Sequence, residues 1–270
     1  MNYCLTGAII GSIAGSRLSY YNRKEPDPEL MRLVSNDCTY TDAVVLNLAT
    51  KFSLDSKGAV DFAGAYKFLT RLYPDIDYGF LFFNWVMTNS DTPNKSWGAG
   101  ASMRIAYLGD YATSLSEVQR LATKSAICTH DTSEAILAAS VFASCVWMLR
   151  HDYDKADVLR YARKMYNMSK DFSDFYKTDT TAFDCKTTLM QALNCFAKGT
   201  NYITCIRNMY RMCCDHSTVG AMTGALAGAY YQQFPPYALK RLPEILPDYL
   251  LNIWDKHAEE TIEREIKKYG

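Results

Sequence analysis

The run Cys213-Cys214-Asp215-His216-Ser217-Thr218 places thiols, a carboxylate, an imidazole and two hydroxyls directly before an apolar helix. Polar groups at the start of a rigid, buried helix could form a functional site. Helix capping is the alternative, because a helix start favours an acidic residue. His216 beside two cysteines suggests zinc, but zinc needs about four suitably spaced ligands. The chain has no C-x-x-C or H-x-x-x-H pattern, so a zinc site is not predicted.

Three further stretches carry candidate side chains. Thr41-Asp42 opens a second helical run. Either residue could be a functional group, or it could be no more than the N-cap of that helix. Cys185 follows Asp184 and could act as a nucleophile, although a buried thiol is the default for cysteine. The loop 96–102 contains Gly98 and Gly100. Its backbone could approach a phosphate or ribose, and a simple turn explains the same glycines equally well.

Two stripes of small residues predict the elements that position these groups. Glycine recurs at every fourth position in both stretches, so each set lies along one helical face. The two sets are Gly7, Gly11 and Gly15, and Gly220, Gly224 and Gly228. Glycine costs about 1 kcal/mol in a helix interior relative to alanine. We therefore expect the two helices to pack closely against each other at the middle of the protein.

The remaining pattern predicts an all-α fold, with one compact domain of about a dozen helices over residues 1–270. The predicted helical ranges are 5–18, 41–52, 58–72, 116–129, 133–149, 155–168, 187–198 and 255–269, with a further helix entered at 103–106. Residues 78–90 are rich in aromatic side chains. No run of β-branched alternation predicts a sheet. Two polar stretches, 19–40 and 169–184, are predicted to be non-helical, and the first is long enough to suggest a functional role.

Composition excludes some classes of function. With 29 basic and 29 acidic residues, the chain lacks the basic field that non-specific nucleic-acid binding requires. Nine cysteines at irregular spacing predict reduced thiols and a cytoplasmic location. The N-terminal apolar run lacks preceding basic residues and is a poor signal peptide. No uninterrupted apolar stretch of about 18 residues is found, so no membrane span is predicted.

Five motifs, in order over most of the chain, resemble those of the ADP-ribosylglycohydrolase family, the fold of dinitrogenase-reductase activating glycohydrolase. Gly7–Ser16 is similar to the opening motif G-A-I-I-G-D-x-x-G-S, and Thr39–Val44 is similar to F-T-D-D-T. Ser96–Arg104 is similar to S-x-G-N-G-x-x-M-R, and Thr129-His130 is similar to a T-H turn. Cys213–Thr218, with 224–229, is similar to G-G-D-T-D-T and the small-residue helix that follows it. The resemblance implies an all-helical domain that removes ADP-ribose from a conjugate with two Mg²⁺ ions.

The resemblance also implies roles for individual residues. Asp42 and Asp215 would be catalytic, and Thr41, Asp42, Asp215 and Thr218 would be metal ligands. The implied substrate-binding residues are Gly98, Gly100, Ser102 and His130. Mg²⁺ prefers hard oxygen ligands, and two close ions position water and the ribose hydroxyls.

The chain departs from the family pattern at several of these positions. Ala43 stands for the second aspartate of the first motif, Ser217 for the second aspartate of the last motif, and Ser12 for the aspartate of the opening motif. Ala99 replaces the asparagine of the glycine loop. Glu25 or Glu29, in the 19–40 loop, could replace a missing acid. We therefore expect at most one Mg²⁺ ion.

Three functions follow as hypotheses. The first is a pseudoenzyme that binds ADP-ribose or ADP-ribosylated protein. The second is an active hydrolase with a reduced one-metal site, acting on ADP-ribosyl or a related nucleotide-sugar group. The third is a structural or interaction protein that retains only the fold.

Overall fold

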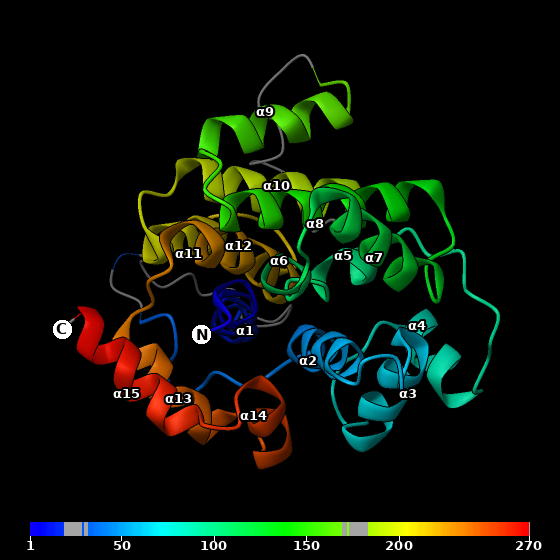
Figure 1. Cartoon of the computed structure of the whole chain (residues 1–270), viewed down its shortest axis with the longest axis horizontal. Helices are drawn as coiled ribbons and strands as arrows, with labels where there is room; N and C mark the ends of the chain where they lie inside the picture. The colour runs from blue at the N-terminus through cyan, green and yellow to red at the C-terminus, as the bar shows by residue number, and fades with distance from the viewer. Residues whose placement is uncertain (19–28, 30–31, 169–171, 173–182, 270) are drawn as a thin grey trace.

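The computed structural model describes residues 1–18, 29, 32–168, 172 and 183–269, and this part of the chain contains fifteen helices and no strand. The predicted all-α class is confirmed (Figure 1). The helices are α1 Tyr3–Ser16, α2 Asp42–Asp55, α3 Phe62–Leu72, α4 Phe80–Met87, α5 Gly100–Met103, α6 Leu108–Tyr111, α7 Leu115–Ile127, α8 Ser133–Arg150, α9 Lys155–Met165, α10 Cys185–Lys198, α11 Tyr202–Tyr210, α12 His216–Tyr231, α13 Pro236–Ile245, α14 Asp248–Trp254 and α15 Ala258–Tyr269.

The centre of the fold is the pair α1 and α12, which lie against each other along their glycine stripes. A Cβ atom added to Gly7 would lie 2.1 Å from the carbonyl oxygen of Gly224, and one added to Gly11 would lie 2.1 Å from that of Gly220. Only glycine permits this approach, because any side chain would overlap the opposite backbone. The predicted close pairing of the two helices is therefore confirmed.

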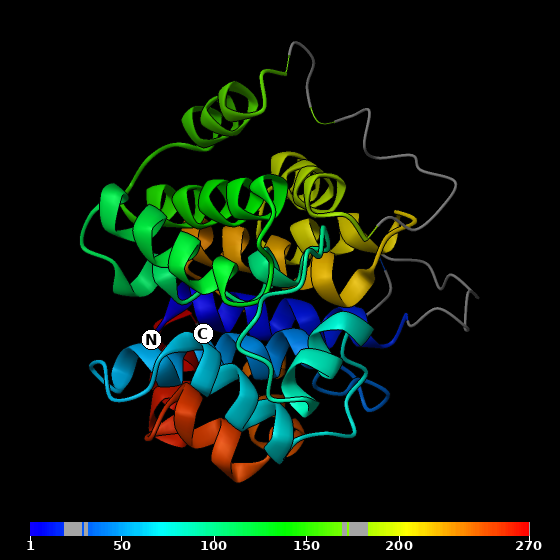
Figure 2. The same ribbon diagram turned by 90° about the vertical axis from the view of Figure 1, so that its right-hand side faces the viewer.

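The other helices form layers around this pair (Figure 2). Helices α8, α10 and α11 contact α12 on one side. Helix α2 contacts α1 on the other side and carries α3 beyond it, while α13 to α15 complete that side. The C-terminal end of α1 and the N-terminal ends of α2 and α12 consequently meet in one region.

Local signals explain where most helices begin. The Asp215 carboxylate accepts a hydrogen bond from the Thr218 amide and caps α12, and Ser114 caps α7 in the same way. The predicted ranges contain no helix at α13 or α14, a segment rich in proline, which usually interrupts helices. Pro236 instead occupies the first turn of α13, and Pro247 stands at the N-cap of α14. Proline is well accommodated there, since those amides have no intrahelical acceptor.

Helix α8 is long and apolar enough to meet the length and composition test for a membrane span, contrary to the sequence reading. It is the one such helix in the described ranges, and 61% of its 18 residues are buried. It contacts α5, α6, α7, α9, α10 and α12, so the protein itself covers much of its surface. A core helix of this length passes the same test.

Most of the 19–40 loop and of the 169–184 stretch lies outside the described residues, and so does Glu25. Glu29 is described. Its carboxylate pairs with Arg207 at 3.0 Å and also with Arg211, both on or directly after α11. It lies at the protein surface in this arrangement, and it is not among the residues that line the cleft described below.

Candidate functional site

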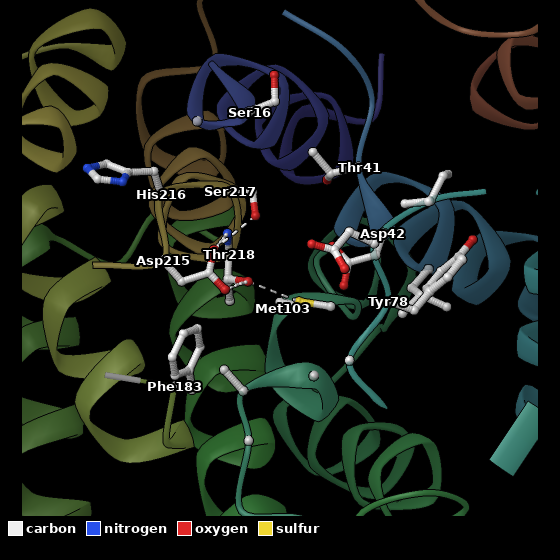
Figure 3. Close-up of a pocket in the computed structure, with 18 of the residues that line it drawn as sticks. Ser16, Thr41, Asp42, Tyr78, Met103, Phe183, Asp215, His216, Ser217 and Thr218 are labelled. Atoms are coloured by element: carbon white, nitrogen blue, oxygen red, sulfur yellow. Dashed lines mark hydrogen bonds between the residues drawn. The ribbon is translucent and has the colours of Figure 1, made fainter. Parts of the chain in front are cut away.

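A cleft of about 1110 Å³ opens where the ends of α1, α2, α5 and α12 meet. The segment from Leu72 to Phe82 and Phe183 complete its walls. Figure 3 shows Asp42 and Asp215 on opposite walls, with their carboxylates directed toward each other. The rigid α1–α12 pair holds one wall of this arrangement in place.

Asp215 is held at the start of α12 by three hydrogen bonds from the same turn. Its Oδ1 accepts from the Ser217 hydroxyl at 3.0 Å and from the Thr218 amide at 3.2 Å. Its Oδ2 accepts from the Thr218 hydroxyl at 2.8 Å. The carboxylate therefore has a defined orientation, and the position that resembles a second aspartate is a hydroxyl donor to the first.

On the opposite wall, Asp42 is the first residue of α2 and Thr41 occupies its N-cap position. The Thr41 hydroxyl makes no capping hydrogen bond and instead pairs with the Ser12 hydroxyl of α1 at 2.7 Å. Asp42 Oδ1 accepts from the Ala43 amide at 2.7 Å. Burial, followed by the negative charge of Asp215, raises the pKa of Asp42 from 3.8 to about 7.

The helix ends give the cleft a positive dipole component. Helices α2 and α12 have 14 and 16 residues, and both direct their N-termini at the cleft. Each N-terminus carries roughly half a positive charge. This dipole favours the negative charge of the two aspartates, whose carboxylates accept from the Ala43 and Thr218 amides.

Another part of the cleft wall contains the glycine loop 96–102 and the imidazole of His130. Gly98, Gly100 and His130 line the cleft. The His130 Nδ1 pairs with the Thr129 hydroxyl at 2.7 Å, and burial together with the Arg104 charge lowers its pKa from 6.5 to about 3. Ser102 is fully buried and is not among the cleft-lining residues.

Comparison with known proteins decides the family. The family model described as ADP-ribosylglycohydrolase matches residues 3–267. The chain belongs to the ADP-ribosylglycohydrolase family. A solved structure described as an "ADP-ribosylglycohydrolase-related protein complex" superimposes with a TM-score of 0.73 at 21% identity, covering 93% of this chain and 94% of that one. At that identity the likeness supports the fold alone. A search of curated proteins found no match.

The structure brings together most of the residues selected from the sequence. Thr41, Asp42, Asp215 and Thr218 line one cleft with Gly98, Gly100 and His130, whereas Ser102 does not reach its surface. Their chemical roles stay predictions.

The structure also bears on two alternatives from the sequence, a zinc site at His216 and a nucleophilic Cys185. The His216 side chain points away from the two aspartates (Figure 3). Within the described ranges, no group of three or more His, Cys, Asp or Glu residues could hold a metal ion. Cys185 is buried, and burial raises the pKa of its thiol to about 11, the opposite of an activated nucleophile.

The sequence reading missed two acidic residues of the cleft, Asp75 and Asp77. Asp77 is exposed, and its charge adds to the raised pKa of Asp42. The pattern Pro74-Asp75-Ile76-Asp77 contains a pair of carboxylates two positions apart. That spacing is a weak signal, because only the fold brings the loop beside α2.

The donor set fits one magnesium ion. Asp42 and Asp215 offer facing carboxylates, and Thr41 and Thr218 offer hydroxyl oxygens beside them. Magnesium is often held by one or two carboxylates and several waters. The mutual repulsion that raises the pKa of Asp42 would be relieved by a cation between the two carboxylates. A second ion would have no carboxylate of its own among these four residues.

Proposed function

We propose that this protein is an ADP-ribosylglycohydrolase-like pseudoenzyme that binds ADP-ribose or an ADP-ribosylated protein in its cleft. The observation that carries the proposal is the pairing of a large, preformed cleft with a reduced acidic centre. Two carboxylates face each other, and hydroxyl or methyl side chains stand at the neighbouring positions Ser12, Ala43 and Ser217.

The shape and polarity of the cleft support ADP-ribose as the ligand. Its volume of about 1110 Å³ is large enough for a nucleotide sugar. Gly98 and Gly100 line the cleft without side chains, so a phosphate or ribose can approach the backbone there. Exposed apolar side chains at the rim, Leu72, Phe80 and Leu81, offer a surface for the adenine ring.

The reduced acidic centre supports the loss of efficient hydrolysis. Two-metal hydrolysis needs carboxylates that hold both ions and fix the attacking water. Ser12 and Thr41 instead satisfy each other at 2.7 Å, and Ser217 donates its hydroxyl to Asp215. These hydroxyls stabilise the remaining side chains but contribute no negative charge toward a second ion.

A hydrolase with a single magnesium ion is the second candidate, and the facing pair Asp42 and Asp215 favours it. Asp42, Asp215, Thr41 and Thr218 would hold the ion, which when bound would polarise an oxygen of the ligand or of water. The chain itself would contribute the fixed orientation of the Asp215 carboxylate at the start of α12.

Calorimetric titration of ADP-ribose with and without Mg²⁺, combined with a hydrolysis assay on ADP-ribosylated protein, tests the proposal. We expect binding without turnover in both conditions. The matched variants are Asp215→Asn at the centre and Asp91→Asn on the surface, where the Asp91 side chain is 99% exposed. Turnover that requires Mg²⁺ and is lost only in Asp215→Asn would replace the proposal by the second candidate. No binding in either condition would leave a structural or interaction protein.

The proposal includes a reducing, cytoplasmic location. All nine cysteines are described and none forms a disulfide, which supports reduced thiols.

A further inference from the structure

A buried arginine stands behind the His130 side chain of the cleft. Arg104 is fully buried, and its guanidinium lies over the Tyr66 ring, 4.0 Å from the centroid. Its Nη2 donates to the Ser125 carbonyl at 2.6 Å and to the Thr129 hydroxyl at 2.8 Å. The Nε and Nη1 atoms have no hydrogen-bond partner among the described residues. A buried cation with three of its five N–H donors unused is costly, so packing alone does not account for it.

The Thr129 hydroxyl connects this cation to His130. It accepts a hydrogen bond from Arg104, which has only donors. It also contacts the His130 Nδ1 at 2.7 Å. If Nδ1 carried a proton, the buried hydroxyl hydrogen would be left with the Cys128 thiol, which is only a weak acceptor. The hydroxyl therefore donates to Nδ1, and an oxygen that already accepts from a cation is a stronger donor.

This arrangement determines the protonation of the other ring nitrogen. With Nδ1 accepting, the neutral imidazole carries its proton on Nε2. The Arg104 charge disfavours a second proton on the ring. A Cβ added to Gly100 would lie 3.1 Å from Nε2, and both residues line the cleft, so the Nε2–H group is at the cleft wall where residue 100 has no side chain to cover it.

We propose that Arg104 and Thr129 are positioning residues that fix His130, the histidine that the family resemblance implies for substrate binding, as a neutral Nε2–H donor toward an oxygen acceptor of the ligand. The inference rests on the proposed function for its ligand, ADP-ribose, whose phosphate and hydroxyl oxygens can accept. The site would reject a ligand that presents a donor there, because two donors cannot share a hydrogen bond.

Nuclear magnetic resonance tests the positioning without any ligand. Long-range ¹H–¹⁵N correlation on the ¹⁵N-labelled full chain at pH 7 distinguishes a protonated from an unprotonated ring nitrogen. We expect His130 with unprotonated Nδ1 and protonated Nε2. Thr129→Val keeps the shape and removes the hydroxyl, so a mixture of tautomers should appear. Thr223→Val, a buried threonine of α12, should leave the His130 signals unchanged.

Three results would overturn the positioning. They are a wild-type His130 protonated on Nδ1, a charged imidazole at pH 7, and a Thr129→Val spectrum identical to that of wild type. Arg104→Lys serves as a second variant, since lysine retains the charge but not the fork geometry. It should keep the ring neutral while weakening the preference for the Nε2–H tautomer.

Calorimetric titration with ADP-ribose tests the acceptor. Loss of one hydrogen bond should weaken binding by about three- to tenfold in His130→Ala. His130→Gln retains an amide N–H donor and should restore most of the affinity, whereas a purely structural histidine would not be rescued. Equal losses in the alanine and glutamine variants would overturn the donor role. If wild-type protein does not bind ADP-ribose, the proposed function and the ligand assignment fail together, and the resonance experiment still decides the positioning.

Discussion

The substitution Gly224→Ala tests whether the direct contact between α1 and α12 organises the fold. A Cβ on residue 224 would lie 2.1 Å from the Gly7 carbonyl oxygen and 3.1 Å from the Gly11 Cα. Both are backbone atoms within a buried helix, so no side-chain rotation can relieve the overlap. The two helices would have to separate by about 1.3 Å to restore ordinary contact distances near 3.4 Å.

The magnitude follows from opposing effects. Alanine has a better helix propensity than glycine by about 1 kcal/mol. Overpacking a rigid core costs about 1–3 kcal/mol and occasionally more. Because the neighbouring contacts of Gly7 and Gly11 open together with this one, we expect an overpacking cost of about 4 kcal/mol, above the usual range, and a net loss of about 3 kcal/mol in the free energy of unfolding. For a chain of this size, that corresponds to a fall in Tm of roughly 6–12 °C.

Urea denaturation and differential scanning calorimetry measure this loss. Gly79→Ala is the matched control, since a Cβ there would meet nothing within 4 Å. Replacing this N-cap glycine of α4 should cost at most about 1 kcal/mol. A Gly224→Ala protein as stable as the Gly79→Ala control would refute the reasoning. It would mean that the helices can separate without loss of packing.

Three further predictions concern the cleft. Because the fold raises the pKa of Asp42 from 3.8 to about 7, its contribution to stability is present below pH 4 and is lost as the pH rises through 7. Without Mg²⁺, Asp42→Asn should thus be more stable than wild type in urea by up to about 4 kcal/mol at pH 8 and gain nothing at pH 4; an equal effect at both pH values would contradict this. The pKa of His130 is lowered from 6.5 to about 3, so its stability contribution is present above pH 6.5 and is lost as the pH falls toward 3. Between pH 7 and pH 5, His130→Gln should lose about 2 kcal/mol less stability than wild type, and parallel urea curves would argue against it. Thiol labelling of the native protein should favour the half-buried Cys128 and Cys213 over the buried cysteines, and ADP-ribose should slow only Cys213, which lines the cleft; equal protection of both would point to a global effect of the ligand.

Much of the helical framework could be predicted from the sequence, because its signals are local. Helix α12 follows from its glycine period and from the acidic residue at its start, Asp215. Helices α13 and α14 were missed because proline is a start signal or a stop signal depending on its position. The local sequence of α8 also does not show whether this apolar helix crosses a membrane or lies in a protein core. The helices packed around it in the fold account for its burial.

The candidate site was predictable only in part. The resemblance selected Asp42 and Asp215, and the structure places them on facing walls. Asp77 was not predicted, because its loop reaches the cleft only through the tertiary fold. Ser102 was selected from its motif but lies beneath the surface, since the short helix α5 turns it into the core.

The sequence by itself determined the helical class, the close pairing of the two glycine-striped helices and the identity of the polar residues at their ends. These properties depend on residue type and on a period of four, which act within a few turns of helix. The tertiary structure decided which charges share a space. It brought Asp42 near Asp215, placed Arg104 behind Thr129 and His130, and thereby determined which groups ionise in the cleft. Ionisation depends on distance and burial across the fold, and neither quantity is encoded in local spacing.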